Sequence, residues 1–124
     1  MYDKEIVLEI LTQIHSSIEK ITIRFEPIRN VNDFTDSPQG LEKLDSICMQ
    51  IIAIGESLKN IDKITDNKLL VKYTEVDWQG AKGMRDIITH HYFDIDAEQI
   101  FWVCKHQMKP LSDVVLKIIK DLNK

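Results

Sequence analysis

The sequence predicts an all-α protein, a bundle of four to five helices in which residues 1–124 form a single domain. Three observations favour this fold. Apolar residues recur at spacings of three and four over long stretches, which is the period of an amphipathic helix. The chain has only four Gly and three Pro, so few turns can separate its elements. Serine or aspartate precedes several periodic stretches, where its side chain can cap a helix.

The first helix is predicted over residues 3–25, because one apolar stripe continues through it without interruption. Pro27 ends this helix, and residues 26–36 form a polar loop from which Phe34 tucks back under the helices. The stripe consists of Ile6, Val7, Ile10, Leu11, Ile14, Ile18, Ile21 and Phe25.

The second helix is predicted from Ser37-Pro38 to about Ile61, since the serine can cap it and proline suits the first helical position. Gly55 would let a partner helix pack closely. Glu56, beside it, is either a buried acceptor or a solvated carboxylate. The apolar stripe consists of Leu41, Leu44, Ile47, Cys48, Ile51, Ile54, Leu58 and Ile61.

Residues 62–76 are less regular, and we expect one short helix there, starting near Thr65 or Asp66. A helix over residues 78–91 follows, with Asp77 placed to cap its first free amides.

The last helical stretch begins after Asp96, where Gln99 is spaced to reach back in a capping box. It continues to the end of the chain. Pro110 removes one amide inside this pattern, so we expect a kink or a break near residues 107–109.

The helix over residues 78–91 carries more chemically able side chains than any other segment. Tyr92 would return beside Arg85 on a helical wheel, seven residues on. Gly80 and Gly83 each cost a helix roughly 0.5–1 kcal/mol against alanine, which suggests that something approaches closely there. The core side holds Ala81, Met84, Ile87 and Ile88. The polar face holds Lys82, Arg85, Asp86, Thr89 and His90.

This polar face has a proton carrier and a cation that could bind a phosphate. His90 can transfer protons near neutral pH, and Arg85 can bind a phosphate through two parallel N–H bonds. Asp86 is placed to orient the imidazole or to hold Arg85. The alternative is a surface ion pair of Arg85 with Asp86 beside an ordinary exposed histidine.

Metal and cofactor sites are not expected. His90 and His91 point to different sides of a helix, and Cys104 and His106 are also badly spaced for joint ligation. His91 lies nearer the apolar side and is expected to interact with free carbonyls at the helix end. Cys48 and Cys104 fall on apolar positions and are expected to be reduced, buried thiols.

Charge and hydropathy restrict the partners. A net charge of −4 argues against a broad nucleic-acid surface, so any action on RNA must depend on a local site. The N-terminal residues are too acidic for a signal peptide, and no apolar run approaches the roughly 18 residues that span a bilayer. We therefore expect a cytoplasmic protein.

The pattern of Arg85, four residues, His90, one residue and Tyr92 resembles the R-x4-H-x-Y signature of HepT-like toxins in the HEPN superfamily. The segment Ile54 to Ser57 is similar to that family's IGEA segment, and residues 78–96 resemble its W…GMRN…H-x-YF-x-VD block. One departure is Val76-Asp77, where many relatives have a proline before the tryptophan.

This resemblance implies a homodimeric HEPN-type bundle that acts as an endoribonuclease toxin. Arg85 and His90 would be catalytic, with Asp86 and Thr89 supporting them. The cognate antitoxin, a minimal nucleotidyltransferase, would neutralise the toxin by transferring AMP to Tyr92. Since one chain offers a single histidine in this motif, we expect a twofold dimer to bring two copies of the polar face to one cleft.

Two rival hypotheses remain open from the sequence. In the first, the chain is a non-catalytic module that presents a nucleotide or substrate to a nucleotidyltransferase, using the face of Arg85 and Tyr92. In the second, it is a purely structural helical dimer.

Overall fold

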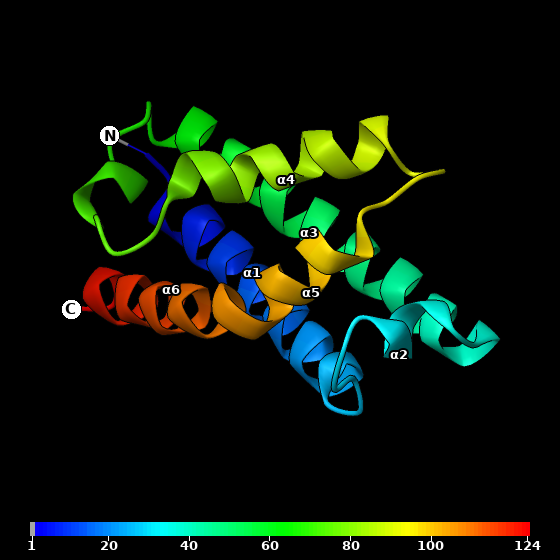
Figure 1. Cartoon of the computed structure of the whole chain (residues 1–124). Coiled ribbons are helices and arrows are strands. Elements are labelled where there is room, and N and C mark those ends of the chain that lie inside the picture. The colour runs from blue at the N-terminus through cyan, green and yellow to red at the C-terminus, as the bar shows by residue number, and fades with distance from the viewer. Residues whose placement is uncertain (1) are drawn as a thin grey trace.

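The computed structural model describes residues 2–124 and confirms the all-α prediction, since these residues form helices and no strand (Figure 1). The helices are α1 (Lys4–Phe25), α2 (Asn32–Thr35), α3 (Pro38–Ile64), α4 (Trp78–His90), α5 (Ala97–His106) and α6 (Met108–Leu122), with a single 3-10 turn, η1 (Leu70–Lys72). Five of these helices are longer than two turns, in agreement with a bundle of four to five helices. No helix among the described residues is long and apolar enough to cross a membrane.

Side-chain caps start four of the helices, and three of these caps, Ser37, Asp77 and Asp96, were predicted. The side chains of Asp3, Ser37, Asp77 and Asp96 each accept a hydrogen bond from a backbone N–H in the first turn that follows. These bonds satisfy amides that have no partner within the helix. Because Ser37, Asp77 and Asp96 could be recognised as caps in the sequence, the starts of α3, α4 and α5 were predicted to within a residue.

Only one of the two hydrogen bonds of the predicted capping box at α5 forms. The carboxylate of Asp96 does accept from the backbone N–H of Gln99, at 3.2 Å. The side chain of Gln99 does not reach back, because its Nε2 lies 3.9 Å from Sδ of Met84 on α4. The break expected near residues 107–109 is confirmed: α5 ends at His106, and Pro110 lies in the first turn of α6.

The segment between α3 and α4 differs from the prediction. The short helix expected near Thr65 is not there, because Asp66 and Asn67 adopt left-handed φ angles of 54° and 59° that end α3. Only the turn η1 follows. The indole Nε1 of Trp78 then donates to the backbone oxygen of Tyr73 at 2.7 Å, which fixes the start of α4.

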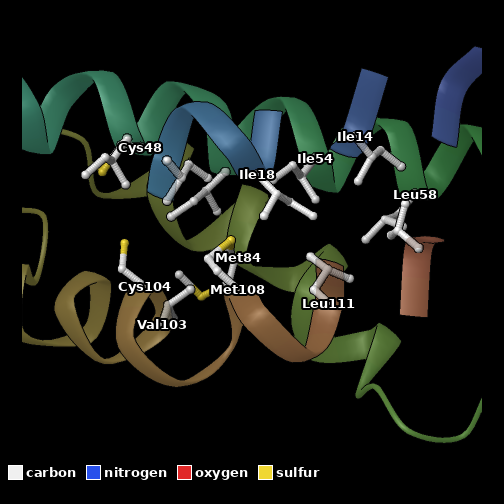
Figure 2. Packing of buried hydrophobic residues seen from close by; sticks show 14 of the residues in the cluster. Ile14, Ile18, Cys48, Ile54, Leu58, Met84, Val103, Cys104, Met108 and Leu111 are labelled. Atoms are coloured by element: carbon white, nitrogen blue, oxygen red, sulfur yellow. The ribbon is translucent and has the colours of Figure 1, made fainter. Parts of the chain in front are cut away.

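The core lies between α1, α3, α4, α5 and α6, and Figure 2 shows side chains from these helices meeting there. Phe34 is fully buried, as predicted, and its ring centroid lies 6.1 Å from that of Phe25. The apolar stripes are wider than the surface that neighbouring helices cover. As a result Ile6, Leu41 and Ile87, all assigned to the core side, are 42–46% exposed.

Both cysteines are free and buried, as expected. Burial raises the pKa of Cys48 and of Cys104 to about 12, because an apolar environment disfavours the thiolate. Both thiols therefore stay protonated at neutral pH and contribute to packing, not to nucleophilic chemistry.

Candidate active site

Helices α3 and α4 pack antiparallel at a contact that has no room for a side chain. A Cβ atom added to Gly55 would lie 2.8 Å from Cβ of Arg85 and 3.4 Å from the backbone oxygen of Lys82. Closer to the start of α4, Nζ of Lys82 lies 2.5 Å from Oδ2 of Asp62 on α3, in a mostly buried ion pair. These contacts fix the register of α4 and confirm that Gly55 permits close packing.

Arg85 is held by two carboxylates, one from each helix. Its Nε lies 2.6 Å from Oε1 of Glu56, an ion pair without hydrogen-bond geometry, and its Nη1 donates to Oδ1 of Asp86 at 2.9 Å. The hydrogen bond to Asp86 and the charge of Glu56 raise the pKa of Arg85. Within residues 2–124 no hydrogen bond occupies Nη2, so the N–H groups of this nitrogen can still donate to an anion.

Asp86 joins Arg85 to a second cation. Nζ of Lys59, on α3, lies 3.3 Å from the same Oδ1. The hydrogen bonds from Arg85 and then from Lys59 hold the pKa of Asp86 below its usual range. Of the two roles expected for Asp86, the structure has it holding Arg85. The four charges of Glu56, Lys59, Arg85 and Asp86 sum to zero.

Thr89 uses its hydroxyl hydrogen within α4. Its Oγ1 lies 2.9 Å from the backbone oxygen of Arg85 and 3.3 Å from that of Asp86. Such a bond is local to the helix. Thr89 therefore supports the helix turn that carries the guanidinium, and its oxygen lone pairs remain free to accept.

His90 is the last residue of α4, and its side chain is exposed. Within the part of the chain that the structure describes, its imidazole makes no ion pair or hydrogen bond. His91 is the C-cap: its backbone N–H donates to the oxygen of Ile88, and its Nδ1 lies 3.7 Å from Oδ1 of Asp94. The two histidines thus differ, since only His91 is tied to the chain around it.

Tyr92 lies beyond the helix. Because α4 ends at His90, a helical wheel does not extend to Tyr92, and the expected position of its hydroxyl beside Arg85 no longer follows from the helix. Tyr92 and Phe93 are 64% and 91% exposed, and their ring centroids are 4.3 Å apart.

The two glycines of α4 have different explanations. A Cβ atom at Gly80 would come within 2.5 Å of the carboxylate of Asp77 that caps α4, so a larger residue there would displace this side chain. At Gly83 a Cβ atom would meet nothing within 4 Å. The expectation of a close neighbour is therefore unmet at Gly83 within the chain, and its surface is open.

The charge network that α3 contributes to was not predicted from the sequence. Glu56 was left undecided and Lys59 was not considered, although their spacing of three residues places them on one helix face. Such a pair of opposite charges was the available signal. Among the described residues, no cluster of three or more His, Cys, Asp or Glu side chains could hold a metal ion.

A cavity of about 270 Å³ lies away from these residues, on another side of α4. It is mostly apolar and reaches Met84, Trp102 and Met108. Figure 2 shows Met84 and Met108 next to each other in this region. Arg85, His90 and Tyr92 do not line it, so the candidate site is a surface site.

The structure is thus an all-α bundle that carries Arg85 and His90 on α4 and Tyr92 two residues beyond the end of this helix. Residues 11–118 match the family described as Ribonuclease HepT-like, and the chain belongs to that family.

Proteins of Methanocaldococcus jannaschii are similar to this chain. One, named "Putative RNase MJ0127", is 29% identical over 103 residues, which cover 78% of this chain and 82% of that protein. Another, "Gamma-glutamylcyclotransferase and putative RNase MJ0434", is 31% identical over 80 residues, 64% of this chain but only 34% of that protein. No solved structure matches the chain significantly. The family and these names support an RNase.

Proposed function

We propose that this chain is a metal-independent endoribonuclease toxin that cuts RNA with Arg85 and His90. The observation that carries the proposal is the contrast at the end of α4. A guanidinium is held by two carboxylates with Nη2 left free, while an imidazole five residues later is exposed and makes no hydrogen bond within the described residues. A positioned cation for the phosphate and a histidine that can carry protons are groups that metal-independent phosphodiester cleavage requires.

The reaction proposed is attack by the ribose 2′-oxygen on the neighbouring phosphorus. The 2′-hydroxyl loses its proton to a base, the new P–O bond closes a 2′,3′-cyclic phosphate, and the bond to the 5′-oxygen breaks. A general acid gives that oxygen its proton. Arg85 offsets the negative charge that accumulates on the phosphate oxygens, through the N–H groups that Glu56 and Asp86 leave free.

Base and acid are two roles, and each chain supplies one histidine of this motif. We propose that two chains form a twofold dimer in which both copies of His90 and Arg85 face one cleft. The open surface at Gly83 supports this arrangement, since a second backbone can approach there without meeting a side chain.

The partner proposed is a nucleotidyltransferase antitoxin that transfers AMP from ATP to the phenolic oxygen of Tyr92, with release of pyrophosphate. The 64% exposure of Tyr92 supports this role, because an enzyme can reach its hydroxyl. The modification would add a charged nucleotide two residues from His90 and so block access of RNA.

The test is RNA cleavage by protein purified without the antitoxin, in the presence of EDTA. We expect cleavage by the wild-type chain and none by His90→Ala. His91→Ala is the matched control, because it removes the neighbouring imidazole, and we expect full activity. A wild-type chain that binds the nucleotidyltransferase but leaves RNA intact would instead support the non-catalytic module.

A further inference from the structure

Two exposed aromatic rings follow the proposed catalytic histidine. Phe93 is 91% exposed and Tyr92 64% exposed, and their rings lie 4.3 Å apart at an interplanar angle of 33°. They belong to the connection between α4 and α5, which protrudes from the bundle in Figure 1. Folding does not explain a phenyl ring that is almost wholly in water, since it gains no burial there.

The position of Phe93 relates it to the site. It follows His90 by three residues, so their Cα atoms are at most about 11 Å apart. A nucleotide flanking a phosphate bound at His90 is therefore within reach of the ring.

The charges of the chain give little attraction for RNA, so another source of binding affinity is needed. The chain carries a net charge of −4, and Glu56 and Asp86 offset the charges of Arg85 and Lys59. The Coulomb attraction on which most RNA binding depends is therefore weak here. Stacking of bases on aromatic side chains is a source of affinity that does not depend on charge.

We propose that Phe93, together with Tyr92, forms a stacking platform for a nucleobase of single-stranded RNA next to the cleaved phosphate. This proposal rests on the proposed function, which places the cleaved phosphate at Arg85 and His90. Every base has a flat π-face, so the platform would bind bases with little sequence preference.

The small size of this aromatic surface favours a base over a protein partner. Asp94, which follows Phe93, is exposed and lies near His91, and Asp96 is also exposed. The two rings are thus a small apolar surface with charged neighbours. A protein interface would offer a larger continuous apolar patch around its aromatic anchors.

The experiment measures binding apart from cleavage. In the His90→Ala background, a short single-stranded RNA with a fluorescent adenine analogue is titrated with protein at low and high salt. Replacing Phe93 by alanine should raise Kd about tenfold or more, and by a similar factor at both salt concentrations. Phe93→Trp should keep the affinity and the quenching of the base analogue. Phe93→Leu, which keeps apolar bulk without a ring plane, should behave like alanine.

Trp102→Ala is the matched control, since Trp102 is another exposed aromatic residue, on α5, and should leave RNA affinity unchanged. Full affinity in Phe93→Leu or Phe93→Ala would overturn the platform, as would an effect of Phe93→Ala on association of the chains with RNA affinity unaltered. The two proposals fail separately. RNA binding that depends on the ring, without cleavage by the wild type, would contradict only the nuclease; cleavage with Phe93-independent affinity would contradict only the platform.

Discussion

Gly55 and Arg85 are in such close contact that a methyl group added to the glycine would lie 2.8 Å from Cβ of the arginine. The proposed catalytic cation is thus positioned against the backbone of α3. Glu56, the next residue on α3, reaches the same guanidinium. Packing and charge therefore act together on one side chain, and each can be tested alone.

Gly55→Ala should destabilise the protein. Overpacking typically costs about 1–3 kcal/mol, while alanine gains about 1 kcal/mol over glycine in a helix, so the net loss should be up to about 2 kcal/mol. Because α4 must move away, RNA cleavage should fall as well. Denaturant unfolding and initial cleavage rates measure the two effects.

Gly83→Ala is the matched change on the open surface of α4, where nothing lies within 4 Å of the added Cβ. It should raise the free energy of unfolding of one chain by up to about 1 kcal/mol. If a second copy packs there, dimer formation and cleavage should weaken, as sedimentation and activity would show. Equal losses of stability in both variants would contradict the packing described here.

Glu56→Gln should lower kcat/KM by about 10- to 100-fold. The reason is that the guanidinium of Arg85 loses the negative charge that holds its Nε, so its free Nη2 is no longer positioned for the phosphate. Glu56→Asp should recover part of the activity. Glu42→Gln changes another exposed carboxylate of α3 and should have no effect. Tighter RNA binding at an unchanged rate would show that Glu56 only opposes the phosphate and does not position Arg85.

Tyr92 should be the residue that the antitoxin modifies. Protein co-expressed with the nucleotidyltransferase should gain the mass of one or more adenylyl groups, and Tyr92→Phe should abolish the gain. Tyr73→Phe should keep it, because the hydroxyl of Tyr73 donates to Asp121 at 2.8 Å and is only partly accessible. A modified Tyr92→Phe protein would place the acceptor elsewhere.

The free energy of unfolding should fall at alkaline pH, because the phenol of Tyr73 ionises. Burial and the hydrogen bond to Asp121 raise the pKa of Tyr73 from 10.0 to about 12. A raised pKa means that the folded chain favours the neutral phenol. This stabilisation is complete below pH 10 and is lost as the pH rises to about 12. Unfolding free energies over this range should decline less in Tyr73→Phe; identical slopes would contradict this assignment.

The helices and their starts could be predicted because the information is local. Ser37 and Asp77 act within one turn of their own position, and apolar periodicity defines each stripe. The width of each stripe was not predictable, since exposure at Leu41 and Ile87 depends on which helices cover them.

The candidate site was predictable only in part. Arg85 and His90 could be proposed from their spacing and from a family signature, but the contact of Glu56 with Arg85 depends on the register of two helices. Tyr92 shows a different limit. A helical wheel assumes a continuous helix, and α4 ends two residues earlier.

The most direct test of the account compares cleavage of one RNA in EDTA with that of the same RNA carrying a 2′-deoxyribose at the cut. We predict that the wild-type chain cuts only the ribose substrate, leaving a 2′,3′-cyclic phosphate, and that His90→Ala cuts neither. Cleavage of the deoxy substrate, a requirement for a metal ion, or wild-type rates in His90→Ala would contradict the proposed site.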